Sequence, residues 1–377
     1  MTHSNDWYIK YAYALAAIVL TIYAMITAKA IVVPFLFAIF ISILLTPLAG
    51  WLEKYRIPRV ISSLVAITVA VLVLFGVGFF FYTQMTAFVN DSDTIIMRLE
   101  ELLFSVDEFL SSWFAFEGEI NLERIVVELL EYIQANIASL SRGISSAASV
   151  ITNVFLVPVF IFLILLFRSQ LKNFVMMAFG GDNDSRNRRV RVIIIKIRVL
   201  IQNYITGVLI VIVILSFLNS IMLLVIGVDH AIFFGVFAAM LNIIPFVGPL
   251  LGSILPIVYS LITMDSLIYP LIIMLGFYVI QLFEGNLFTP TIVGSQVSMN
   301  ALATLLLLFI GGQIWGLSGM ILFIPIGAIM KIIFDEVESL QPFGYVMGRR
   351  AEDKSEQRSR LARKVSELAE KSKPVSD

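Results

Sequence analysis

The sequence NIIPFVGP, residues 242–249, interrupts a long apolar segment that runs from residue 231 to 264. Each of its prolines, Pro245 and Pro249, removes a backbone N–H donor and clashes with the preceding helical turn, while Gly248 permits backbone angles that are closed to other residues. Within lipid, the backbone groups that such a break frees must be satisfied by protein or by water lining a cavity. The break therefore predicts a functional position.

The composition indicates a membrane protein. The chain has 377 residues, of which 59% are hydrophobic and 14% charged, whereas an ordinary soluble domain is roughly 25% charged. The formal net charge of −1 gives no reason to expect a nucleic-acid partner. With no cysteine and only two histidines, His3 and His230, we expect no disulfide, no metal site and no catalytic triad. We also expect no cofactor.

Apolar runs of membrane-spanning length recur along the chain. They occupy about residues 8–28, 31–51, 60–83, 146–167, 199–226 and 266–285. Two further segments, 231–264 and 301–334, would each be about 50 Å long as one straight helix. As two arms of about 15 residues, each arm would reach only about 22 Å, short of a crossing. We therefore predict an all-α polytopic membrane protein with about eight hydrophobic segments, two of them re-entrant hairpins. The alternative is that segments 231–264 and 301–334 each form one broken span, which would also leave the C-terminus on the cytoplasmic side.

The two hairpins predict an inverted repeat. Span 199–226 with its hairpin and span 266–285 with its hairpin follow the same plan in opposite orientations, a design of secondary transporters whose site lies near the membrane midplane. The second hairpin also carries a break, GGQIWGLSG at residues 311–319, followed by Pro325. The alternative for these glycines is close helix packing alone.

The loop charges predict the orientation. Basic residues gather in the loop before residue 60 and in the loop 168–198, so both loops are expected in the cytoplasm. The region 84–145 holds three arginines and eleven acids, which indicates the outer side. Helical spacing of apolar residues predicts two amphipathic helices there, whose apolar faces pack on each other, on the membrane or on a neighbouring subunit. Residues 7–28 could instead be a signal sequence, but the run is long and a second span follows at once.

These observations predict five parts of the chain. Residues 1–83 form three transmembrane helices, 84–145 the extracytoplasmic region, and 146–198 a fourth helix with the basic loop. Residues 199–334 form the transport core, and 335–377 a charged cytoplasmic tail.

Glu284 is the candidate charged residue of the core. It lies near the end of an apolar span, where Gln281 shares its helix face and Asn286 follows two residues later. An acid in a membrane span is costly and therefore predicts cation binding or proton exchange. The alternative is an interfacial acid that caps a loop or pairs with a basic residue.

Three amides, Asn242, Asn300 and Gln313, lie at or near the two breaks. They could contact a solute, or they could satisfy the broken backbone. No phosphate-binding glycine-lysine loop is present, so ATP-driven transport would need another subunit. No paired carboxylates accompany a nucleophile, and we do not expect an enzyme.

Several of these motifs together resemble one family. Residues 244–249, 281–286, Pro290, the glycines between 311 and 319, and Pro325 are similar to the autoinducer-2 exporter family of bacterial inner-membrane proteins. Ala301 departs from that pattern, in which proline is common. The resemblance implies a multi-span transporter that forms oligomers. It implies export of a small polar signalling molecule for some members and exchange of sodium or lithium for protons for others.

Two functions remain open at this point. The first is facilitative or secondary transport of a small polar solute, and the second is Na⁺(Li⁺)/H⁺ antiport with Glu284 as the coupling acid; a channel or a structural assembly forms a third class. Both termini are expected in the cytoplasm, with the lipid bilayer and further copies of the chain as partners. The predicted binding residues are Asn242, Pro245, Gly248, Pro249, Gln281, Glu284, Asn286, Asn300 and Gln313.

Overall fold

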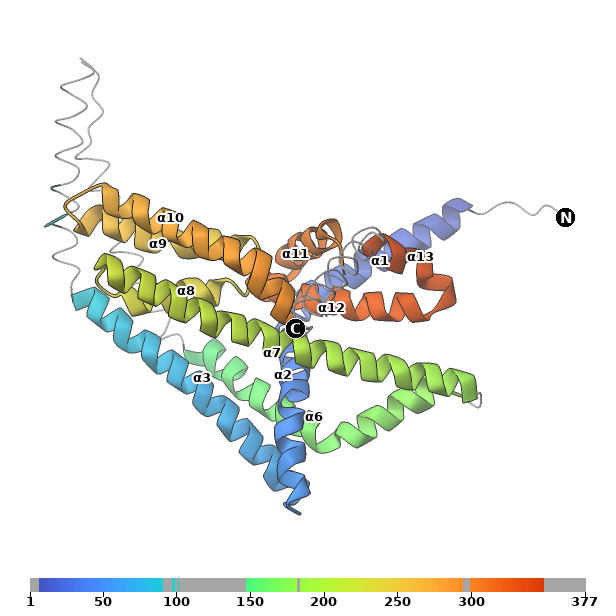
Figure 1. Cartoon of the computed structure of the whole chain (residues 1–377). Helices are drawn as coiled ribbons and strands as arrows, with labels where there is room; N and C mark the ends of the chain where they lie inside the picture. Colours follow the sequence, from blue (N-terminus) through green and yellow to red (C-terminus); the bar gives the residue numbers. More distant parts are fainter. Residues whose placement is uncertain are drawn as a thin grey trace, which may run out of the picture. The chain divides into compact units, whose positions relative to one another are not determined.

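The computed structural model describes residues 7–90, 97–98, 101, 147–181, 184–293 and 299–348. Within these ranges the chain is helical, and the only pairing of strand type is an isolated bridge between Met299 and Gly348. The helices are α1 Trp7–Thr27, α2 Lys29–Lys54, α3 Arg59–Asn90, α6 Ala147–Phe179, α7 Asp184–Ile226, α8 Ala231–Leu241, α9 Val247–Thr263, α10 Ile268–Phe283, α11 Ala301–Trp315, α12 Leu317–Glu336 and α13 Gln341–Met347, with a π-helical segment Glu284–Val293 and a 3₁₀ turn Glu338–Leu340 (Figure 1).

Seven helical stretches in the described ranges are long and apolar enough to cross a membrane. Their apolar side chains are largely exposed: in α3, Leu74 is 64% and Phe75 is 68% exposed. A continuous apolar surface of this kind is stable in contact with lipid and would aggregate in water. The prediction of an all-α polytopic membrane protein is therefore confirmed.

The chain divides into two compact units. Unit 1 comprises Met1–Thr27, Asn173–Tyr204 and Gly294–Asp377, and unit 2 comprises Ala28–Lys172 and Ile205–Val293. Helices α6 and α7 each run through a boundary, so the chain passes between the units along continuous helices.

In unit 2, α2, α3 and α6 pack through small residues. Ala38, Ala49 and Ala66 are fully buried together with Ile161 and Leu165. Small side chains let helix backbones approach closely, which is the main source of helix association where lipid surrounds the protein.

The rest of unit 2 is built from the C-terminal half of α7 with α8, α9 and α10. Leu223 of α7, Tyr259 of α9 and Ile273 of α10 are buried in one cluster with α8. Close approach is again set by glycine, because a Cβ on Gly235 would collide with Ser220 of α7.

Helices α8 and α9 form the hairpin predicted for residues 231–264 (Figure 1). A Cβ on Gly252 of α9 would meet Ala238 of α8 at 2.8 Å. With 11 and 17 residues, the arms measure about 16 and 26 Å, each shorter than the roughly 30 Å of hydrocarbon. Re-entry into the membrane remains a prediction that these lengths favour.

Unit 1 contains the second hairpin, formed by α11 and α12. The helices meet at Gly316, whose φ of 64° is readily adopted by glycine and rarely by other residues. Gly311 and Gly319 face each other so closely that a Cβ on either would overlap the backbone of the other. The arms differ from the equal pair expected, because α12 has 20 residues and is itself long enough to cross a membrane. Helix α1 joins α11 through Trp315, whose indole N–H donates to the Met25 carbonyl at 3.0 Å.

The predicted basic loop 168–198 is mostly helical. Helix α6 continues to Phe179 and α7 begins at Asp184. Arginine and lysine favour helices, so a basic segment can prolong a span beyond the membrane while still marking the cytoplasmic side. Within unit 1, Lys196 of α7 forms an ion pair with Glu336, at the end of α12.

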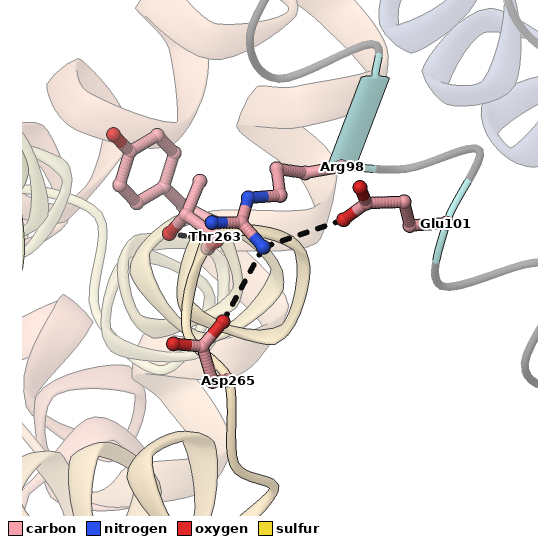
Figure 2. A network of polar contacts seen from close by, with 5 residues as sticks. Arg98, Glu101, Thr263 and Asp265 are labelled. Carbon is pink, nitrogen blue, oxygen red and sulfur yellow. Dashed lines mark hydrogen bonds and ion pairs between the residues drawn. The ribbon is translucent and has the colours of Figure 1, made fainter.

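Of the predicted extracytoplasmic helices, only residues 97, 98 and 101 belong to the described part. Figure 2 shows Arg98 between two carboxylates, with its Nη1 3.3 Å from Glu101 and 3.3 Å from Asp265 in the turn after α9. The side chain of Asp265 is 88% exposed, so solvent screens this network. The remaining residues of the two predicted amphipathic helices, and the tail 349–377, lie outside the described residues.

Candidate functional site

The break at residues 242–249 is a compact turn between α8 and α9. The N–H of Ile244 donates to the Leu241 carbonyl at 3.0 Å, which extends α8 by a final turn. The N–H of Val247 then donates to the Pro245 carbonyl at 2.8 Å. Phe246 lies at the centre of this second bond with φ 67° and ψ −44°. A γ-turn with positive φ is rare and strained, above all for an aromatic residue.

Gly248 allows α9 to start directly against the end of α8. A Cβ at this position would overlap the Leu241 carbonyl and approach the Cα of Asn242 to 2.8 Å. Its N–H also donates to the Ile244 carbonyl at 2.9 Å. The break therefore needs glycine because of the space available, whereas Pro245 supplies the acceptor of the γ-turn.

A cavity of about 330 Å³ adjoins this turn inside unit 2. It lies between the second half of α7, the α8–α9 hairpin and α10. Its lining residues are Leu215, Asn219, Ala238, Asn242, Phe246, Pro249, Leu250, Ser253, Met274, Phe277, Tyr278, Ile280 and Gln281. An apolar cavity with a few polar side chains is the usual form of a small-molecule site.

Three of the predicted binding residues meet at this cavity. Asn242, Pro249 and Gln281 line it together, although Gln281 belongs to a different helix, α10. The exposed side chain of Phe246, whose backbone is strained, lines it as well. Packing of α10 against the hairpin explains the meeting, and no spacing in the sequence could predict it.

Three further polar lining residues, Asn219, Ser253 and Tyr278, were not predicted. Asn219 of α7 is 4% exposed, and its Oδ1 has no hydrogen-bond partner in the described part of the chain. Ser253 donates its hydroxyl to the Leu250 carbonyl at 2.9 Å. An amide inside an apolar span is itself a functional signal, so Asn219 could have been identified as a candidate, but not the face it occupies.

Glu284 begins the π-helical segment that follows α10. Its carboxylate accepts a hydrogen bond from Gln281 Nε2 at 2.7 Å and another from the Thr289 hydroxyl. The helical stretch continues from Ile268 to Val293, 26 residues in all, so the helix runs on beyond Glu284 and beyond the apolar span that was expected to end at about residue 285. This π-helical segment has ten residues, whereas π-helices are rare and mostly single turns, which are frequent at functional sites. Since Gln281 also lines the cavity, it connects the cavity wall to the acid.

Asn286 is exposed, and its amide donates to the Leu282 carbonyl at 2.8 Å within its own helix. It is not among the residues that line the cavity. On the other side of this segment, α7 approaches closely at Gly207, where a Cβ would lie 3.1 Å from the Ile292 carbonyl oxygen.

Asn300 and Gln313 belong to unit 1, whereas the cavity lies wholly in unit 2. Asn300 caps α11 by accepting from the Ala303 N–H at 2.8 Å, and its amide donates to the Val346 carbonyl at 2.7 Å. Of the two roles considered for this residue, these contacts match satisfaction of the backbone. Gln313 is exposed on α11.

Among the described residues there is no group of three His, Asp or Glu side chains that could hold a metal ion. The chemistry that the cavity offers is therefore hydrogen bonding by amides and hydroxyls within an apolar wall, next to one acid.

Comparison with known proteins agrees with this architecture. Residues 15–339 match the family described as AI-2E family transporter. The chain is 26% identical to "Putative transport protein YrrI" of Bacillus subtilis (strain 168), over 81% of this chain and 86% of that protein. It is 24% identical to "AI-2 transport protein TqsA" of Escherichia coli (strain K12), over 85% of this chain and 90% of that protein. The chain is therefore a multi-pass membrane protein that belongs to the AI-2E family of transporters.

Proposed function

We propose that the chain moves a small polar solute across the bacterial inner membrane by a facilitative or secondary mechanism, with the solute bound in the cavity beside residues 242–249. The observation that carries the proposal is the meeting of Asn242, Asn219 and Gln281 at one cavity of about 330 Å³. A volume of this order suits a small organic molecule. The relative named as an AI-2 transport protein makes autoinducer-2 the first solute to test.

The strained turn at Phe246 supports the same site. Backbone strain persists where the surrounding structure maintains it, and it concentrates at binding sites and switch regions. In this chain the strained residue, Phe246, joins the two helices of the hairpin and also lines the cavity. A change in the conformation of this turn would therefore change the cavity wall.

Monovalent cation/proton antiport is the second candidate, and a specific observation favours it. Glu284 lies inside a span-length helical stretch and is held by Gln281 and Thr289. An acid at such a position is costly without a function. In this alternative, Glu284 releases its proton and its carboxylate then binds a sodium or lithium ion. Gln281 contacts Glu284 and also lines the cavity, so it links the ion exchange to the cavity wall.

Flux measurements on the purified protein in liposomes distinguish the two candidates. A pH-sensitive dye inside the vesicles reports proton flux during a sodium or lithium gradient, and labelled autoinducer-2 and small sugars report solute flux. Ser253→Trp would fill the cavity and stop solute flux, whereas Ser266→Trp, in the exposed turn before α10, would leave it intact. Solute flux that is equal in both variants would rule out the cavity as the route.

The antiport candidate has its own matched pair of variants. Glu284→Gln should abolish sodium-dependent proton flux, while Asp229→Asn, which changes an exposed acid between α7 and α8, should not. If Glu284→Gln leaves every flux unchanged, Glu284 does not belong to the site.

The arrangement of the protein in the membrane is part of the proposal. Both termini lie in the cytoplasm, residues 84–145 lie outside, and residues 199–334 form the transport core with its two hairpins. The chain works as a homo-oligomer embedded in the bilayer. Asn300 and Gln313 contribute to the core from the second hairpin, Asn300 by holding its entry in place.

A further inference from the structure

We propose that the charge of Glu284 determines the helical form of residues 284–293. The ionised carboxylate holds this segment as a π-helix through Thr289. Neutralisation of the acid, by a proton or by a bound monovalent cation, releases the segment to wind as an α-helix. This mechanism rests on the proposed transport function and extends it, because it links the state of the acid to the wall of the cavity.

Glu284 is the only acid or base on the helices that surround the segment. The segment packs against α7, α8 and α10 in a cluster that includes Leu215. Over α8, α9, α10, the segment itself and the part of α7 after Tyr204, the sequence has no other Asp or Glu and no Lys, Arg or His. The remaining titratable side chains on these helices are Tyr259, Tyr269 and Tyr278. A change of charge on these helices near neutral pH is therefore a change at Glu284.

The contact between Glu284 and Thr289 depends on the π-helical form. The Thr289 hydroxyl donates to the Glu284 carboxylate, five residues before it in the chain. In an α-helix, residues five apart lie about 140° from each other around the axis and about 7.5 Å along it, so their side chains point to different faces. The backbone of a π-helix bonds residue i to residue i+5, which brings such a pair together. A hydrogen bond to an ionised carboxylate is also a strong one, so it favours the π-helical form.

Pro290, inside the segment, keeps the α-helical form from dominating. In an α-helix its ring would clash with the carbonyl of Asn286, four residues earlier. The π-helix is itself a rare form, which indicates that it is the less stable one for most sequences. Because each form carries a penalty here, one charge-assisted hydrogen bond can decide between them.

A change of helical form reaches the cavity through shared packing. Leu215 of α7 and Ile280 of α10 line the cavity, and both belong to the cluster on which the segment packs. The side chains that the segment contributes are Phe288, Ile292 and Val293. Rewinding would turn these side chains to other faces, so the wall formed by Leu215 and Ile280 would change.

The first test places a trifluoromethyl label on Leu287→Cys, at an exposed position of the segment and as the only thiol of the full-length protein. Fluorine NMR in detergent measures the ratio of the two conformers. Glu284→Gln imitates the neutral acid, and Thr289→Val removes the hydroxyl while keeping the shape. Each should raise the released conformer about tenfold relative to the other. Thr289→Ser, which keeps the hydroxyl, should match the parent protein.

Thr291→Val is the matched control. The Thr291 hydroxyl donates to the carbonyls of Leu287 and Phe288 and not to the acid, so its loss should leave the ratio unchanged. Acidification should raise the released conformer in the labelled parent protein. It should have no such effect in Glu284→Gln, because these helices carry no other acid or base.

A second measurement identifies the helical form itself. Asn286→His combined with Thr291→His places two imidazoles five residues apart at exposed positions, where they face each other only in the π-helical form. Among the described residues no group of acids and histidines competes for a metal ion. Zn²⁺ should therefore bind this pair about tenfold more weakly once Glu284→Gln is added.

Several results would overturn the inference. They are a conformer ratio that Glu284→Gln or Thr289→Val leaves unchanged, an equal response to Thr291→Val, or a Zn²⁺ affinity that does not depend on Glu284. If Thr289→Val does not fold, Thr289→Ala takes its place. Should Ser253→Trp stop solute flux while the ratio is the same in all variants, this inference fails and the proposed function survives. If the ratio responds as expected but Ser253→Trp leaves flux unchanged, the cavity fails as the route and the control of the segment by Glu284 stands.

Discussion

At the scale of single residues, the most informative position is Phe246. Its φ of 67° lies in a region that side chains with a Cβ avoid, and it is reached here because Pro245 and Val247 close a three-residue turn. Such a residue costs of order 1–3 kcal/mol, which the rest of the structure must offset. The strain lies beside the cavity, where a flexible glycine would have formed the turn at lower cost.

At position 246 we therefore expect the usual order of stability to be reversed, so that the glycine variant is more stable than the alanine variant. In the middle of a helix or strand, glycine makes a protein less stable than alanine does, by roughly 0.5–1 kcal/mol. At position 246 we expect Phe246→Gly to be more stable than Phe246→Ala by about 1–2 kcal/mol, because glycine relieves the positive φ and alanine does not. Chemical or thermal unfolding in one detergent measures the difference. A more stable alanine variant would show that the turn is unstrained.

Lys331 gives a second prediction at the same scale. Its side chain in α12 is 11% exposed and forms an ion pair with Asp335, which is 47% exposed. Removing the partner of a buried charge costs more than removing the buried charge itself. We expect Asp335→Ala to destabilise the protein by about 1–3 kcal/mol and Lys331→Met to change stability by less than Asp335→Ala does, as measured by unfolding. Equal losses of stability in the two variants would mean that the Lys331 ammonium is in contact with water.

At the scale of elements, the two hairpins are held by direct contact between backbones. In the α11–α12 pair, Gly311 and Gly319 occupy the point of contact, and α1 covers α11 through the bond from Trp315 to Met25. Since lipid provides no hydrophobic force between helices, such small-residue contacts supply much of the attraction. The glycine series at residues 311–319 thus has a packing role, as its alternative interpretation held.

Replacement of glycines by alanine should show whether a glycine is needed for close contact between helices. Gly311→Ala and Gly319→Ala should each destabilise the hairpin by about 1–3 kcal/mol, because the added methyl meets backbone that cannot yield. Gly76→Ala in α3, where nothing lies within 4 Å, should be neutral or slightly stabilising. Unfolding of the three variants measures this. No loss in Gly319→Ala would contradict the close contact.

The sequence predicts elements better than it predicts the site. Spans, breaks and family follow from apolar length and from the positions of proline and glycine, and the all-α class and the family are confirmed. The helical ends of α6 and α7 were taken for a loop, because charge reveals the side of the membrane but not the backbone conformation. The π-helical continuation after Phe283 was missed because no residue type specifies it. Asn219 was missed because an amide in an apolar run does not show which neighbour it faces.

At the scale of the whole molecule, the two compact units contain different features. Unit 2 contains the cavity, the strained turn and Glu284. Unit 1 contains the second hairpin, the basic part of α7 and the hydrogen bonds that Asn300 donates to Val346 in α13 and to Gly348 after it. The central claim is that the solute passes through the cavity beside residues 242–249. The absence of cysteine from the chain makes that claim directly testable, because a single introduced thiol can be modified alone.

The most direct measurement is solute flux after modification of Ser253→Cys with a charged methanethiosulfonate reagent in liposomes. We expect that Ser253→Cys transports normally, that modification stops its flux, and that excess solute slows the modification. Ser266→Cys, in the exposed turn before α10, should be modified without loss of flux. Full flux through the protein modified at residue 253 would contradict the account, because a charged group filling the cavity would then have no effect on transport.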